Sequence, residues 1–202
     1  LKSTDGASQI IISPKYQAKV FTSTADGGGG KSFGWVNYGA FDKHDPHMNG
    51  YGGEDRLWLG PEGGKFSVFF KPGVKQAFDD WHTPAPIDSE PWTMVSNNAA
   101  KADMEKDMNL QNYAGTNLTM KVQRSIELLN NQSIAQQLGV DLTGLKTVGF
   151  QTINSITNSG TNEWTEASGA PCTWNLDMFA PSEKCTIVIP YINEGSGKVA
   201  TT

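Results

Sequence analysis

Ionisable side chains, aromatic rings and glycines are gathered in one irregular stretch, which reads HDPHMNGYGGEDRLWLGPEGG over residues 44–64. Glycines let the backbone turn sharply and approach a bound molecule closely. Trp58 offers a flat apolar face on which the C–H face of a pyranose can lie, and Asp55, Arg56 and Glu62 can form charge-assisted hydrogen bonds to its hydroxyls. The stretch therefore predicts a carbohydrate-binding turn. The alternative is that Asp55 and Arg56 pair with each other while Trp58 belongs to the core.

Arg124 is a second candidate ligand-binding residue. It falls on the apolar face of a strand, between Val122 and Ile126. A buried charge without a partner costs several kcal/mol or more, so the guanidinium must meet a carboxylate or a ligand oxygen. The alternative is a place at the end of the sheet, from which the side chain reaches water.

A long loop over residues 75–98 contributes Trp81 and His82, with Glu90 and Trp92 further along. Long loops inside a compact domain often line binding sites, so Trp81 is a candidate stacking residue. Aromatic plugs that cover a sheet edge are the alternative. For acid–base catalysis the candidates are Glu62, His82 and His47.

No other chemistry is supported by motif or spacing. The chain has neither a Gly-x-Ser-x-Gly segment nor a His-x-x-x-His pair. Asp42, His44, Asp45 and His47 fit no standard zinc spacing, because Pro46 bends the chain between the histidines. Two of the carboxylates of Glu54, Asp55 and Glu62 could form a catalytic pair for glycoside hydrolysis, but the sequence does not give the distance between them. We predict no metal and no cofactor.

The elements that must position these residues are mostly strands. Residues 118–128 alternate between an apolar and a polar face, which is typical of a strand with one wet side. Similar patterns predict strands at 9–13, 18–23, 66–70, 102–112 and 146–157, and a closing hairpin of 172–179 with 185–191. Met104 and Met108 could also be helical neighbours, so a helix is the alternative at 102–112. Residues 131–138 are expected to form a helical turn that ends at Gly139. The chain is therefore expected to be mainly β, one antiparallel β-sandwich domain over residues 1–202. The register of the closing hairpin separates Cys172 from Cys185, which predicts free, half-buried thiols.

Composition excludes two classes of partner. The 202 residues carry 16 Lys and Arg against 21 Asp and Glu, a net charge of -5 without a basic run, so nucleic acid is not expected. No apolar run approaches the roughly 20 residues of a membrane-spanning helix. The chain opens on Leu1 rather than Met, and we expect a processed product. The oligomeric state is not set by the sequence.

Residues 52–64, GGEDRLWLGPEGG, resemble the signature of an uncharacterised bacterial family that is common in Bacteroidetes. Its members are distantly similar to galactose mutarotase-like supersandwich proteins. Further matching segments lie at 124–129, 138–140, 157–160 and 187–191. The resemblance implies the supersandwich fold, of which residues 1–202 would be the N-terminal portion, and it implies no settled activity. Aldose epimerases of that fold carry a histidine after a Thr-Asn strand, whereas residues 174–179 here contain none.

Three functions follow as hypotheses. The first is a carbohydrate-binding or carbohydrate-processing domain lined by Asp55, Arg56, Trp58, Glu62, Arg124 and Trp81. The second is a sugar epimerase, lyase or hydrolase, and the third is a structural or interaction domain of the cell surface. All three are consistent with a periplasmic, cell-surface or secreted location.

Overall fold

The computed structural model describes residues 1–191, and the fold is mainly β with antiparallel sheets. In chain order the elements are β1 (Gln9–Ser13), β2 (Lys19–Thr24), the 3-10 turn η1 (Tyr38–Ala40), β3 (Arg56–Gly60), the 3-10 turn η2 (Phe78–Asp80), α1 (Ala85–Asp88), β4 (Thr93–Asn97), β5 (Lys101–Gln111), β6 (Asn117–Leu129), α2 (Asn131–Leu138), β7 (Gly149–Asn158) and β8 (Cys172–Leu176). No helix within residues 1–191 is long and apolar enough to cross a membrane.

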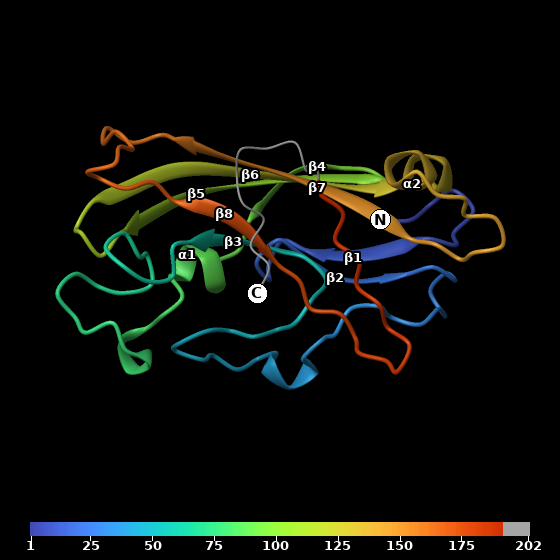
Figure 1. Cartoon of the computed structure of the whole chain (residues 1–202), viewed down its shortest axis with the longest axis horizontal. Coiled ribbons are helices and arrows are strands. Elements are labelled where there is room, and N and C mark those ends of the chain that lie inside the picture. The colour runs from blue at the N-terminus through green and yellow to red at the C-terminus, as the bar shows by residue number, and fades with distance from the viewer. Residues whose placement is uncertain (192–202) are drawn as a thin grey trace.

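A four-stranded sheet in the order β4-β5-β6-β7 is the largest unit (Figure 1). Its centre is the β5–β6 hairpin, whose register pairs Leu110 with Leu118 and Met108 with Met120. Alternate residues of both strands are buried, as the sequence pattern predicts. Helix α2 follows β6 and ends at Gly139, whose φ of 65° is the left-handed conformation that favours glycine. The predicted strands 102–112 and 118–128 and the helical turn 131–138 are therefore confirmed.

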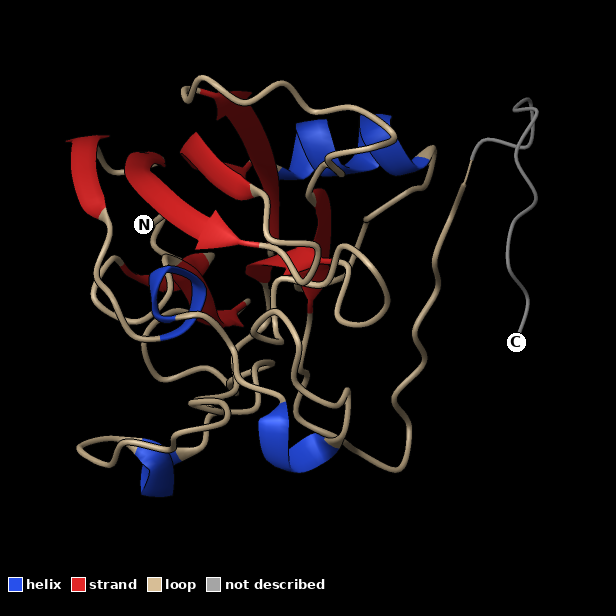
Figure 2. Ribbon diagram, turned by 90° about the vertical axis from the view of Figure 1, so that its left-hand side faces the viewer, coloured by secondary structure: helices blue, strands red, loops and turns tan. Residues whose placement is uncertain are grey.

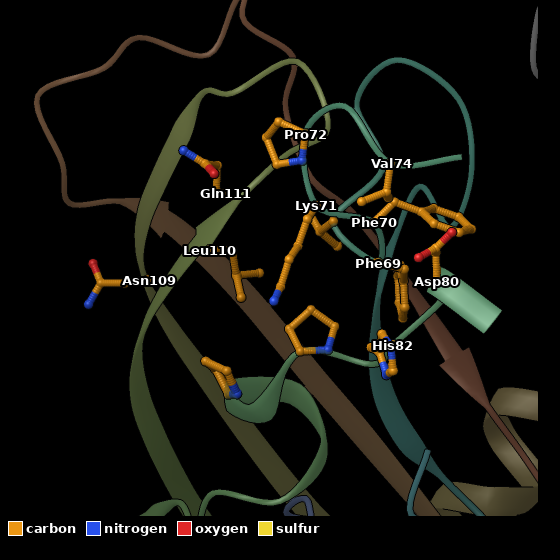
Figure 3. A pocket seen from close by; sticks show the side chains of 13 residues that line it. Phe69, Phe70, Lys71, Pro72, Val74, Asp80, His82, Asn109, Leu110 and Gln111 are labelled. Carbon is orange, nitrogen blue, oxygen red and sulfur yellow. The ribbon is translucent and has the colours of Figure 1, made fainter. Parts of the chain in front are cut away.

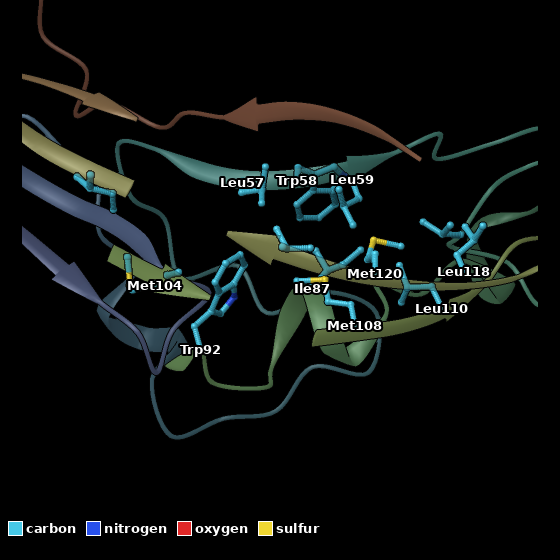
Figure 4. Close-up of a cluster of buried hydrophobic side chains, with 14 of the residues drawn as sticks. Leu57, Trp58, Leu59, Ile87, Trp92, Met104, Met108, Leu110, Leu118 and Met120 are labelled. Atoms are coloured by element: carbon cyan, nitrogen blue, oxygen red, sulfur yellow. The ribbon is translucent and has the colours of Figure 1, made fainter. Parts of the chain in front are cut away.

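The β1–β2 hairpin and the β3–β8 pair supply the other strands around a shared core. Figure 4 shows Leu57, Trp58 and Leu59 of β3 facing the methionines of β5 and β6 across this core. Trp58 and Leu59 are each 1% exposed. Long loops gather on the other side of the molecule, away from most of the strands (Figure 2). The sheets therefore bury one continuous apolar cluster, and the loops are anchored to it by buried residues such as Phe69 and Phe70.

Three local predictions were wrong. Residues 66–70 form no strand, because Val68 N donates to Pro61 O and Phe69 O accepts from His82 N, which draws the segment toward loops. Residues 75–98 are not one loop, since they contain η2, α1 and β4. The stretch at 56–60 is not an irregular turn but the buried strand β3.

The predicted closing hairpin is also not formed. β8 pairs with β3, so that Trp174 lies opposite Trp58, and residues 185–191 are in no strand. The exposed position of this last segment leaves Cys185 without cover. Both thiols are free, as predicted, but they are exposed rather than half-buried.

Gly52 lies where the chain passes against its own backbone. Its φ is 77°, and a Cβ there would lie 2.2 Å from the carbonyl oxygen of Trp35. Gly64, in the same glycine-rich stretch, has a similar φ of 82° but open space around it. Glycine at position 52 is therefore required both by the positive φ and by the close approach of the Trp35 backbone, whereas glycine at position 64 is favoured only by the positive φ of the turn.

We expect Gly52→Ala to lower the free energy of unfolding by about 2–5 kcal/mol, because left-handed strain and a steric clash add. Gly64→Ala is the matched control and should cost only about 1–2 kcal/mol, from strain alone. Urea denaturation of both variants measures the difference. Equal losses would contradict the tight approach at Gly52.

Candidate functional site

Arg124 is buried on the core face of β6 and is 1% exposed. Its Nε donates to Ala18 O at 2.9 Å, its Nη1 donates to Asn154 Oδ1 at 2.8 Å, and its Nη2 forms an ion pair with Asp55. Burial lowers the pKa of Arg124 to about 10, against a smaller opposing effect of Asp177. The guanidinium therefore stays charged at neutral pH and joins the four-stranded sheet to the segments beside β2 and β3.

Arg56, the sequence neighbour of Asp55, has a different partner. Its Nη2 lies 3.1 Å from Asp88 Oδ1, and its guanidinium lies 4.3 Å from the centre of the Trp58 ring. Burial lowers the pKa of Arg56 to about 10, while Asp88 opposes the shift. Asp88 also accepts hydrogen bonds from Gln17 Nε2 at 2.7 Å and from Asn49 Nδ2 at 2.6 Å. The alternative of an Asp55–Arg56 pair is thus not formed, and each residue instead belongs to a separate buried ion pair.

Four of the predicted ligand-binding residues therefore lie inside the protein. Asp55 is 6% exposed, Arg56 2%, Trp58 1% and Arg124 1%. The polar partners found for Asp55, Arg56 and Arg124 belong to the protein. The side chain of Glu62 is exposed, and its backbone carbonyl accepts a hydrogen bond from Ser67 Oγ at 2.7 Å. A role of these residues in binding a ligand stays a prediction, whereas the structure shows their contacts within the protein.

A cavity of about 610 Å³ lies between β5 and the loops that follow β3 (Figure 3). Its apolar lining comes from Val68, Phe69, Phe70, Val74, Leu110 and three prolines, and its polar lining comes from Lys71, Asp80, His82, Asn109 and Gln111. Pockets for small organic ligands span roughly 300–1,000 Å³ and combine mostly apolar walls with a few polar groups. The cavity has both properties.

A stack of aromatic rings connects the core to this cavity. The ring of Trp58 stacks on Phe69 with centroids 5.5 Å apart, and Phe69 stacks on Trp81 at 5.3 Å. Phe69 lines the cavity, whereas Trp81 lines a smaller hollow beside it with Phe70 and Phe78. Trp58 thus supports the cavity wall from behind.

His47 and His82 lie against each other, with ring centroids 4.6 Å apart. His47 Nδ1 lies 2.7 Å from Trp81 O, and His82 Nδ1 lies 2.7 Å from Pro46 O. Because a carbonyl oxygen only accepts, each Nδ1 carries a hydrogen, and in a neutral ring the lone pair is then on Nε2. Two of the three acid–base candidates are thus together, with His82 in the cavity lining. Glu62 is not among the lining residues.

Sequence reasoning missed the other polar residues of the cavity. Lys71 directly follows the predicted strand 66–70, and Asn109 and Gln111 lie within the predicted strand 102–112, so no pattern marks them as site residues. Asp80 lay inside the loop at 75–98 without being singled out. Its position two residues before His82 is the only signal that could have drawn attention to it. Within residues 1–191 no group of three or more His, Cys, Asp or Glu could hold a metal ion.

Lys19 is a buried cation of a different kind, and it is 1% exposed. Its Nζ donates to Gly52 O and lies 5.5 Å from the centre of the Phe21 ring. Burial, with a smaller effect of the Arg56 charge, lowers the pKa of Lys19 to about 7. The amine is therefore close to half-protonated at neutral pH in the folded protein.

Comparison with known proteins gives one family. A family model described as "Family of unknown function (DUF6786)" matches residues 1–202, the whole chain. No curated protein matches the chain, and no solved structure matches it. The expectation of an uncharacterised family is confirmed.

Asp55→Ala should lower the free energy of unfolding by about 3–5 kcal/mol, because it leaves the Arg124 charge buried and unpaired. Asp26→Ala is the control. It breaks an ion pair with Lys146 in which both side chains are more than half exposed, and such pairs contribute about 0–1 kcal/mol. Chemical denaturation compares the two variants. Similar small losses in both would show that the Arg124–Asp55 pair is not structural.

Lys19 should make stability depend on pH. Between pH 7 and the usual lysine pKa of about 10.4, the unfolded chain binds up to one more proton at this amine than the folded protein. The free energy of unfolding should therefore rise with pH over this range, by up to about 1.4 kcal/mol per unit, and be flat below pH 7 for this group. Lys19→Met should remove that rise between pH 7 and pH 9, as measured by urea denaturation at both values. The exposed Lys15→Met is the control, and an unchanged slope in Lys19→Met would refute the effect.

Proposed function

The chain belongs to the family of unknown function DUF6786, and from its own geometry we propose that it binds a carbohydrate in the cavity between β5 and the loops after β3. The observation that carries the proposal is the composition of this cavity. Phe69, Phe70 and Leu110 supply apolar lining, and Lys71, Asp80 and His82 supply charged or polar groups beside it. A sugar presents the same combination, because its rings have apolar C–H faces and polar hydroxyl edges.

The charges in the cavity are free to meet a ligand. Neither Lys71 nor Asp80 forms an ion pair with any other of residues 1–191. This contrasts with Arg56 and Arg124, whose charges are neutralised inside the protein. Because charged groups are strong hydrogen-bonding partners for neutral hydroxyls, Lys71 and Asp80 are suited to orient a sugar.

We also propose that the fold is the antiparallel β-sandwich of galactose mutarotase-like proteins. Its support is the shared core between the β4-β5-β6-β7 sheet and β3, together with the GGEDRLWLGPEGG segment. A bacterial origin of the Bacteroidetes type and a periplasmic, cell-surface or secreted location belong to the same proposal. They rest on the sequence resemblance alone.

One observation favours a second function, the processing of a sugar by acid–base chemistry. His82 lines the cavity together with Asp80 and Lys71, and because its Nδ1–H donates to Pro46 O, the neutral ring has its lone pair on Nε2. A general base needs such a free nitrogen within hydrogen-bond reach of the proton that it takes. Turnover of a bound sugar, followed by proton exchange in deuterated water, would distinguish processing from binding.

The binding proposal is tested by isothermal titration calorimetry against a panel of monosaccharides and oligosaccharides. Lys71→Met should weaken binding of a saccharide by about 10-fold or more, since a hydrogen bond to a charged group contributes roughly 1.5–3 kcal/mol. Lys75→Met is the matched control, because this exposed lysine lies outside the lining and should bind as the wild type does. Absence of heat with every saccharide would end the proposal.

A further inference from the structure

The outer half of β5 has no neighbour on one side. β4 pairs with β5 only as far as Glu105, while β6 pairs with β5 along its whole length to Gln111. Beyond Glu105, β5 is therefore a free edge of the four-stranded sheet. Free edges expose main-chain N–H and C=O groups that can pair with another molecule.

The direction of the main-chain groups on this edge follows from the register. Thr119 O accepts from Ser159 N at 3.0 Å, so the main chain of Thr119 faces β7 rather than β5. Thr119 is opposite Asn109, and opposed residues of an antiparallel pair turn their main-chain groups either both toward or both away from each other. The N–H and C=O of Asn109 thus point away from β6. Gln111, two residues further, points the same way.

These groups face the cavity, whose lining includes Asn109, Leu110 and Gln111. The opposite wall is the segment Val68–Phe70, and the two walls meet at one end, where Tyr113 N donates to Ser67 O at 2.7 Å. Past that hydrogen bond they separate, because Phe69 O accepts from His82 N. The cavity therefore lies where strand pairing would otherwise continue. Within residues 1–191, the main-chain groups of Asn109 and Gln111 have no hydrogen-bond partner.

The side chains of the same two residues are already engaged on the outer face of the sheet. Asn109 Oδ1 accepts from Thr119 Oγ1 at 2.9 Å, and Gln111 Nε2 donates to Asn117 Oδ1 at 3.1 Å. Figure 3 shows Asn109 directed away from the other lining side chains. The polar groups that β5 offers to a ligand are therefore its main-chain groups.

We propose that the main-chain N–H and C=O groups of Asn109 and Gln111 hydrogen-bond the ligand, and that this ligand is a linear oligosaccharide lying along β5. The inference rests on the proposed carbohydrate function and specifies its substrate class. Two donor–acceptor sets recur about 7 Å apart, the span of two strand residues. Lys71 and His82 lie elsewhere in the same lining. Polar groups spread along a wall in this way match a chain of linked sugars, whose hydroxyls repeat along its length.

Proline substitution tests the edge, because proline removes the N–H and is tolerated on a free sheet edge. Asn109→Pro and Gln111→Pro should each weaken binding of linear tetrasaccharides by about 10-fold or more. Asp107→Pro is the matched control, since Asp107 has the same main-chain direction but is not in the cavity lining. It should bind within about twofold of the wild type.

The probes are linear tetrasaccharides of glucose, mannose, galactose and xylose, each with its monosaccharide, measured by calorimetry. Unchanged tetrasaccharide binding in both proline variants, with loss in Lys71→Met, overturns this inference and leaves the carbohydrate function standing. If no saccharide binds the wild type, both fail. If instead a synthetic peptide of alternating valine and threonine binds, and Asn109→Pro abolishes it, the edge recognises a peptide by strand addition and the oligosaccharide is excluded.

A second measurement needs no variant to fold. Amide hydrogen exchange in the wild-type chain should slow about 10-fold or more at Asn109 and Gln111 when a bound tetrasaccharide is present, because both N–H groups become hydrogen-bonded. Exchange at Asp107 is the internal reference and should not change. Equal exchange at Asn109 and Gln111 with and without the bound tetrasaccharide would contradict the inference.

Discussion

The guanidinium of Arg124 is the charge around which the layers of this protein are arranged. It lies among the apolar residues of β6, where an unpaired charge would cost several kcal/mol. Its partners come from three places in the chain, which are Ala18, Asp55 and Asn154. Beside this guanidinium, Gln17 and Ala18 adopt left-handed backbone conformations with φ of 64° and 48°. Such conformations persist only where surrounding contacts hold them.

A second pair, Arg56 with Asp88, fixes the loops in a comparable way. Asp88 receives hydrogen bonds from Gln17 and Asn49, so one carboxylate connects β3, the segment before β2 and helix α1. Asp55 and Arg56 of the GGEDRLWLGPEGG segment are thus neutralised inside the fold, whereas Glu62 is exposed. The ring of Trp58 stacks on Phe69, which lines the cavity, so the core also fixes the position of the cavity wall.

The proposed site lies where the protein leaves polar groups unsatisfied. Lys71 and Asp80 have no ion-pair partner among residues 1–191, and the edge of β5 carries unpaired main-chain groups beside them. Membership of a family of unknown function brings no activity with it. The buried, paired charges of Arg56 and Arg124 are therefore assigned a structural role, and the unpaired charges of Lys71 and Asp80 a role in the proposed site.

The sequence by itself determined the β5–β6 hairpin, helix α2 and the position of Arg124 on an apolar face, because side-chain periodicity and turn residues are local properties. It also required a partner for Arg124, without identifying Asp55. Only the tertiary structure decided that β8 pairs with β3, that residues 66–70 leave the sheet, and that Asn109 turns its main chain toward a cavity. Those outcomes depend on which distant segments compete for the same hydrogen bonds and the same buried charge, and no local pattern records that competition.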